Sequence, residues 1–295
     1  MAKKGDWVIG IIIGMSFLIV GALFLFMLIG LTSQRGTIDL VSWGKKIALV
    51  EVRGVINDPQ PIVRQISLYK KDNSVPGMVL RINSPGGGVS AAQEIYEELR
   101  KFKKTGKKLV ASMGSLAASG GYYIACAADS IMANPGSITG SIGVIYESPN
   151  AQELLKKIGL NIEVVKSGKH KDIGSPTRPL TPEERRVLQS VIDDAYDQFV
   201  KAVCEGRYLE EREVREMADG RIFTGSQAEK LGLVDCLGNY QDAILMAARM
   251  SGIKGKPKTI KIRRKGPSIF DLLVGKLKLW GPDGEYASGL QYRFR

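Results

Sequence analysis

The sequence predicts an α/β fold with a mainly parallel sheet, preceded by one membrane-spanning helix. Short apolar runs alternate with glycine-rich turns and amphipathic helical patterns, and the order strand, turn, helix recurs along the first half of the chain. A separate uncharged stretch near the N-terminus predicts the span. Of the 295 residues, 44% are hydrophobic and 24% are charged, which indicates a folded rather than a disordered chain.

The predicted span covers residues 7–31, which carry no charged side chain. About 20 apolar residues suffice to cross the hydrocarbon core of a bilayer. The run is longer than the apolar part of a cleaved signal peptide and no small-residue cleavage site follows it, so we expect an uncleaved anchor. Lys3 and Lys4 precede the run and only Arg35 follows it closely, which places residues 1–6 in the cytoplasm and the rest of the chain outside the membrane.

After a linker at 32–44, the pattern predicts one folded domain over residues 45–253. Strands are expected at 45–56, 77–82, 107–113, 131–135, 141–146 and 162–168. Helices are expected around 61–71 and at 122–128, 150–159, 181–207 and 240–249. A further helix is expected where Ala91, Ile95, Leu99 and Phe102 form an apolar stripe. Residues 220–235 are typical of a turn, a short helix and a strand-like end.

The longest helical pattern begins with a capping box, in which Thr181 is the N-cap, Pro182 occupies the first turn and Glu184 completes the box. Its apolar stripe is predicted to face the core and consists of Val187, Val191, Ala195, Phe199 and Ala202.

The basic excess is concentrated in a C-terminal tail. Residues 254–295 hold eleven Lys and Arg against three acidic residues, which leaves only +3 of the total charge of +12 for residues 32–253. Such a tail favours an anionic membrane surface or an acidic partner over nucleic acid, and a merely solvated tail is the alternative. Residues 259–264 could pair as an edge strand.

Several chemistries are excluded by composition. Three cysteines cannot form a disulfide framework, and their spacing matches no zinc or redox motif. His170 is the only histidine, which excludes every mechanism and metal site that needs two imidazoles. We therefore expect neither a metal nor another cofactor.

Two glycine clusters carry the candidate chemistry. Residues 83–88 (NSPGGG) fit neither nucleotide-binding pattern, and they could supply an oxyanion-hole amide or simply form a tight turn. Residues 114–121 place Ser119 between alanine and glycine where a strand gives way to a helix, as in a nucleophile elbow. Its base would be His170 or a lysine. The rival serines, for which structural hydroxyl roles are expected, are Ser84, Ser115 and Ser137.

Four segments, in this order, resemble the signatures of the signal peptide peptidase A family, which consists of membrane-anchored bacterial serine proteases of the Clp protease/crotonase superfold. They are INSPGGGVSAA, SMGSLAASGGYYIACAADSIMANPGSITGSIGVI, KSGKHKDIGSPTRPLTPEER and GRIFTGSQAEKLGLVD. The resemblance runs from about residue 46 to 250. It implies repeated ββα units, with Ser119 as nucleophile, Lys171 as general base, Ser141 orienting the lysine, and the N–H groups of Gly87 and Gly120 as the oxyanion hole.

The resemblance further implies a membrane-bound, homo-oligomeric serine endopeptidase that degrades remnant signal peptides in the cytoplasmic membrane. A lysine acts as a base only when it is neutral, which requires burial in an apolar cleft, and Asp172 should therefore face away from the site. The alternatives are a crotonase-like acyl-CoA enzyme, which would use the same glycine amides on a thioester, and a non-catalytic membrane scaffold.

Overall fold

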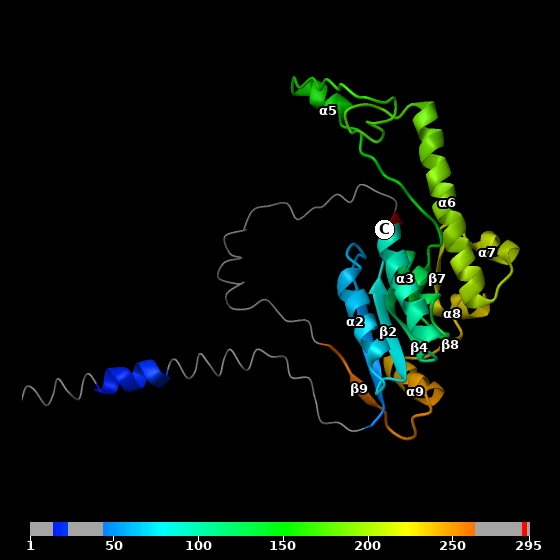
Figure 1. The fold of residues 1–295 in the computed structure, drawn as a ribbon. Coiled ribbons are helices and arrows are strands. Elements are labelled where there is room, and N and C mark those ends of the chain that lie inside the picture. Colours follow the sequence, from blue (N-terminus) through cyan, green and yellow to red (C-terminus); the bar gives the residue numbers. More distant parts are fainter. Residues whose placement is uncertain (1–13, 23–43, 263–290, 294–295) are drawn as a thin grey trace, which may run out of the picture. The chain divides into compact units, whose positions relative to one another are not determined.

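The computed structural model describes residues 14–22, 44–262 and 291–293 (Figure 1). The chain divides into two compact units, residues 1–44 and 45–295. In the first unit residues 14–22 are helical, and the rest of the span expected at 7–31 lies outside the described residues. Within the described ranges, no helix combines the length and hydropathy needed to cross a bilayer.

The second unit is built on one eight-stranded sheet with the order β7-β6-β4-β2-β1-β9, and β5 joins β4 to β8. All strand pairs of this sheet are parallel except β6 with β7. The strands are β1 (Lys46–Arg53), β2 (Gly77–Ser84), β4 (Lys108–Ala118), β5 (Ser130–Ala133), β6 (Ile138–Gly140), β7 (Ile222–Thr224), β8 (Cys236–Leu237) and β9 (Lys258–Ile260).

Helices cover both faces of the sheet, as expected for parallel strands. In β1, Ala48 and Val50 pack into the larger core, with α2 (Gln60–Lys71), α3 (Val89–Lys104), α4 (Gly120–Ala125) and α6 (Pro182–Arg207). Ile47 and Leu49 point to the opposite face, which α9 (Tyr240–Met250) covers. The shorter helices are α5 (Gln152–Lys157), α7 (Glu211–Met217) and α8 (Gly225–Lys230).

Strand β4 changes neighbours along its length, which creates the space for a site. Its first half pairs with β5 and its second half, Leu116–Ala118, pairs with β6. The β2–β4 register also shifts between Ile82 and Ser84. The carboxyl ends of β2, β4 and β6 therefore converge on the turn that leads into α4.

Two predicted strands are absent from the described residues. Residues 141–146 leave the sheet because Ser141 has a positive φ of 51°, which ends β6 at Gly140. Residues 162–168 pair with no strand in the part of the chain that the structure describes, and Ile162, Val164 and Val165 are exposed. Alternating apolar residues in this segment therefore do not mark a buried strand.

Helix α6 has the predicted capping box, since the Thr181 hydroxyl accepts from the Glu184 amide and the Glu184 carboxylate accepts from the Thr181 amide. The predicted core stripe is only half right. Ala195, Phe199 and Ala202 are buried, whereas Val187 and Val191 are 39% and 46% exposed. Among residues 182–194, only Glu184 is buried, so the N-terminal half of α6 contributes little to the core.

The edge strand expected at 259–264 is present as β9, which pairs parallel with the start of β1. Residues 263 and 264 of that prediction lie outside the described part of the chain.

Candidate active site

Ser119 lies in the tight turn between β4 and α4, with φ of 55° and ψ of −120°. Its amide donates to the Gly140 carbonyl at 2.8 Å, and its carbonyl accepts from Tyr123 in α4. The side chain is buried, and the Oγ atom forms no hydrogen bond with any described residue. An unpartnered buried hydroxyl on a strained strand-to-helix turn is typical of a nucleophile held ready for a reaction.

The rival serines differ from Ser119 because their hydroxyl groups are either hydrogen-bonded or exposed. Ser84 Oγ accepts from the Gly86 amide at 3.1 Å, and Ser137 Oγ donates to the Gly114 carbonyl at 2.6 Å. Ser115 is exposed on β4. The structural roles expected for Ser84 and Ser137 are confirmed by these hydrogen bonds.

The glycine cluster forms β3 (Gly86–Gly88), a short strand beside this turn. Gly86 accepts from the Ile56 amide and Gly88 donates to the Ile56 carbonyl, so the backbone groups of Gly87 point to the other side of β3. A Cβ atom at Gly87 would lie 2.2 Å from the Ile56 oxygen. The close approach of these two segments therefore requires glycine.

An extended segment lies on the side of β3 that faces away from Ile56. β10 (Gln291–Arg293) pairs antiparallel with β3, with Tyr292 opposite Gly87. This edge can therefore accept an extended peptide through main-chain hydrogen bonds. The amide of Gly120 belongs to the first turn of α4, whose N–H groups have no acceptor inside the helix.

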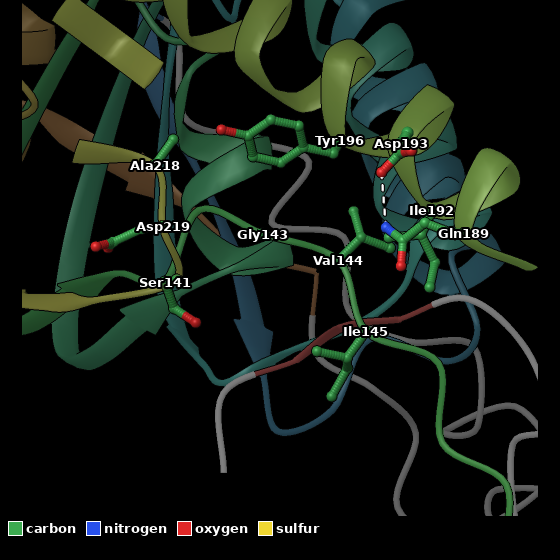
Figure 2. Close-up of a pocket in the computed structure, with 11 residues that line it drawn as sticks. Ser141, Gly143, Val144, Ile145, Gln189, Ile192, Asp193, Tyr196, Ala218 and Asp219 are labelled. Atoms are coloured by element: carbon green, nitrogen blue, oxygen red, sulfur yellow. Dashed lines mark hydrogen bonds between the residues drawn. The ribbon is translucent and has the colours of Figure 1, made fainter. Parts of the chain in front are cut away.

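Ser141 lies next to the nucleophile turn, because the carbonyl of the preceding Gly140 binds the Ser119 amide. It lines a cavity of about 490 Å³ formed by the segment after β6, the middle of α6 and the loop before β7 (Figure 2). Val144 and Tyr196 give this cavity apolar walls, and Asp193 and Asp219 add two carboxylates. Ser119, Ser141, Gly87 and Gly120 are thus gathered at one end of the sheet.

Lys171 lies on a separate segment, residues 147–180, which we call the arm. Figure 1 shows its helix α5 near the N-terminal end of α6. α5 buries none of its residues, and Lys171 itself is exposed. The large apolar side chains that the arm exposes are Leu154, Ile158, Leu160, Ile162, Val164 and Val165.

The arm is tied to the start of α6 by charged hydrogen bonds. Arg178 donates to both Asp172 and Glu184, and Lys166 also binds Asp172. Arg178, followed by Lys166, holds the pKa of Asp172 well below its usual range. Arg178, followed by the Thr181 amide, lowers the pKa of Glu184 to about 2. Asp172 therefore binds two cations other than Lys171.

His170 contacts Glu183 at 3.4 Å, at the same end of α6. Ala195, the next buried residue of α6, lies eleven positions after Glu184, a rise of about 16 Å at 1.5 Å per residue. Neither His170 nor Lys171 is brought to Ser119 within one chain. Arg178 was not predicted from the sequence, in which its only signal is its spacing from Asp172 and Glu184.

Comparison with known proteins gives two family matches. Residues 101–254 match the model described as Peptidase family S49, and residues 46–138 match the model described as Clp protease. The second match agrees with the mainly parallel sheet, and the domain has a Clp protease-like α/β fold.

Three relatives illustrate the similarity. A candidate protease of Synechocystis sp., slr0021, is 49% identical over 71% of this chain and 76% of that protein. A candidate signal peptide peptidase of Enterococcus faecium, SppA, is 39% identical over 70% of this chain and 64% of its own length. Protease 4 of Haemophilus influenzae is 36% identical over 70% of this chain and 35% of its own length. The matched region thus spans less than two thirds of the latter two proteins.

Gly87 and Gly88 offer a matched pair of substitutions. Gly87→Ala should displace β3 from Ile56, lower the free energy of unfolding by about 1–3 kcal/mol and abolish activity, because its Cβ would overlap backbone atoms. Gly88→Ala should be tolerated, since the nearest atoms would lie 3.8 Å away. Thermal unfolding and peptide turnover would check this, and equal effects of the two variants would contradict it.

Arg178→Ala should release the arm without unfolding the sheet, because it removes the shared partner of Asp172 and Glu184. Hydrogen exchange should speed up in residues 147–180 and remain slow in β1, β2 and β4. Arg186→Ala, an exposed change on the same helix, is the control. With the pKa of Glu184 lowered from 4.5 to about 2, the native arm should be fully anchored above pH 4.5 and released as the pH falls through about 2. Unchanged exchange in Arg178→Ala would contradict this anchorage.

Proposed function

Because this chain belongs to peptidase family S49, we propose that it is a membrane-bound serine endopeptidase that uses Ser119 and Lys171 to degrade cleaved signal peptides. The observation that carries the proposal is the buried, unpartnered Oγ of Ser119 on a strained turn beside the edge of β3 that pairs with β10. Family membership supports the serine protease class, and the Enterococcus faecium relative named as a signal peptide peptidase supports the substrate class.

The chemistry is acyl transfer from a peptide to Ser119. As Oγ attacks the scissile carbonyl carbon, its proton passes to the neutral amine of Lys171. The amides of Gly87 and Gly120 donate to the developing oxyanion, for which one such donor contributes about 3 kcal/mol. The lysine then returns the proton to the leaving amine, and water hydrolyses the ester by the reverse sequence.

The base reaches the nucleophile from a second copy of the chain. The arm of one chain holds Lys171 at the outer end of α6 and exposes six large apolar side chains, while Val187 and Val191 of α6 are also exposed. A neighbouring copy that covered these surfaces would bury them and would bring Lys171 to the cavity at Ser141. Such burial would also supply the apolar surroundings that keep a lysine neutral.

The substrate binds as an extended strand. β10 occupies the edge of β3 in antiparallel register, and a signal peptide in the same place would set its backbone against Gly87 beside Ser119. Signal peptides are apolar and have small residues near their ends, which suits the tight space around α4 and the apolar walls formed by Val144 and Tyr196.

The enzyme is anchored once in the cytoplasmic membrane, with residues 45–253 on the extracytoplasmic side. The uncharged run at 7–31 and the lysines before it support this arrangement. Protease added to intact spheroplasts should digest the chain beyond Leu31. Complete protection of that region would overturn the topology.

The dyad makes a specific prediction for four variants. Ser119→Ala and Lys171→Ala should each lower turnover of a synthetic signal peptide by about 10³-fold or more, because the two groups act as a unit. Lys171→Arg should be equally inactive, since arginine stays charged. His170→Ala should keep most of the activity. Loss of activity in His170→Ala with normal turnover in Lys171→Ala would overturn the assignment.

A further inference from the structure

The amino-terminal edge of the sheet carries a concentrated basic surface, which we call the basic edge. The registers Lys46 with Lys258, and Gly77 with Lys108, show that the starts of β1, β9, β2 and β4 lie level with one another. Its exposed lysines that form no ion pair with another described residue include Lys45, Lys71, Lys104, Lys108, Lys256 and Lys258. Lys256 and Lys258 belong to the basic tail, and the other four of these lysines come from residues 45–108.

Nearby carboxylates do not neutralise this surface. Glu98 binds Lys70 and Lys101, and Asp129 binds Lys103. Glu98 and Asp129 are thus paired with lysines outside the basic edge, and Asp72, next to Lys71, accepts from the Ser74 amide and interacts with Lys107 and Lys46. The unpaired lysines remain as a net positive surface.

Helix dipoles explain only part of the basic edge. Lys71 and Lys104 lie in the last turns of α2 and α3, where a cation stabilises the helix end. Lys45, Lys108 and Lys258 lie at or just before the starts of strands, where no helix terminus favours a positive charge. The grouping of these three lysines at one edge of the sheet therefore needs another cause.

An apolar hollow adjoins the basic edge. Leu245, Ala248 and Ile253 line it, and Arg249 and Lys254 flank it at the end of α9. The Ser251 hydroxyl binds the Pro76 carbonyl, which places the end of α9 beside the turn that leads into β2. Cations around exposed apolar groups are the combination that binds anionic lipid at a bilayer interface.

We propose that the basic edge rests on an anionic phospholipid surface and orients the catalytic domain on the membrane. The chain enters β1 at Lys45, so any preceding anchor is joined to the domain at this edge. Ser119 and Gly87 lie at the opposite, carboxyl ends of the strands. Bound in this way, the site faces away from the lipid headgroups, and a substrate reaches it only after leaving the bilayer.

The test uses full-length protein carrying Ser119→Ala, so that its readout is independent of proteolysis. The protein is reconstituted in nanodiscs of phosphatidylcholine, with or without about 30% phosphatidylglycerol, and its lysines are acetylated and counted by mass spectrometry. The six lysines of the basic edge should react at least about threefold more slowly in the anionic discs. This protection should disappear in about 1 M salt, where the Debye length is only 3 Å.

A matched pair of triple variants distinguishes an effect of the lysines on the basic edge from an effect of the protein's total charge. Lys71→Gln, Lys104→Gln and Lys256→Gln together should abolish protection of Lys45, Lys108 and Lys258. The same change at the exposed residues Lys157, Lys201 and Lys230 removes equal charge and should leave that protection intact. Equal labelling in the two kinds of disc, or protection in native membranes only, would overturn the proposal, the latter in favour of an acidic protein partner.

Discussion

The backbone at Ser119 is the constraint on which the rest of the site depends. A positive φ at a non-glycine residue is held there because the Ser119 amide binds Gly140 at the end of β6, while the Ser119 carbonyl begins α4. Those bonds require β4 to exchange β5 for β6 along its length. The same exchange places Ser141 directly after β6, and the pairing of Ser84 with Ala117 holds the glycine turn at the same end of the sheet.

The second constraint is the separation of the proposed base, Lys171, from the nucleophile, Ser119. Arg178 fixes the arm to the start of α6, and that half of the helix extends past the core with its valines uncovered. A site that holds its nucleophile in the sheet and its proposed base on the arm would be inactive in an isolated chain. Assembly would then control activity, because it would supply the base and the apolar surroundings of the lysine together. That arrangement would limit proteolysis to the assembled enzyme.

The sequence predicted most of the fold, and its failures have physical causes. Strands flanked by turn residues, such as β1 and β2, and the capped helix α6 were predictable because local propensity and burial agree there. Residues 162–168 and the valines of α6 were mispredicted because apolar periodicity does not show whether a partner surface lies in the same chain. Ser119 could be singled out by its small neighbours, but the separation of Lys171 from it is a tertiary property. The basic edge was likewise hidden, since its lysines are scattered between residues 45 and 258.

Mixing two inactive proteins tests the central claim most directly. Ser119→Ala retains the arm and Lys171→Ala retains the nucleophile, so each supplies what the other lacks if the dyad forms between chains. When the two variants are dissociated, combined in equal amounts and reassembled, turnover of a signal peptide should recover to about a quarter to a half of the wild-type value. Neither variant reassembled alone should show this recovery of turnover. A mixture that assembles fully and stays inactive would contradict a base supplied by the neighbouring copy.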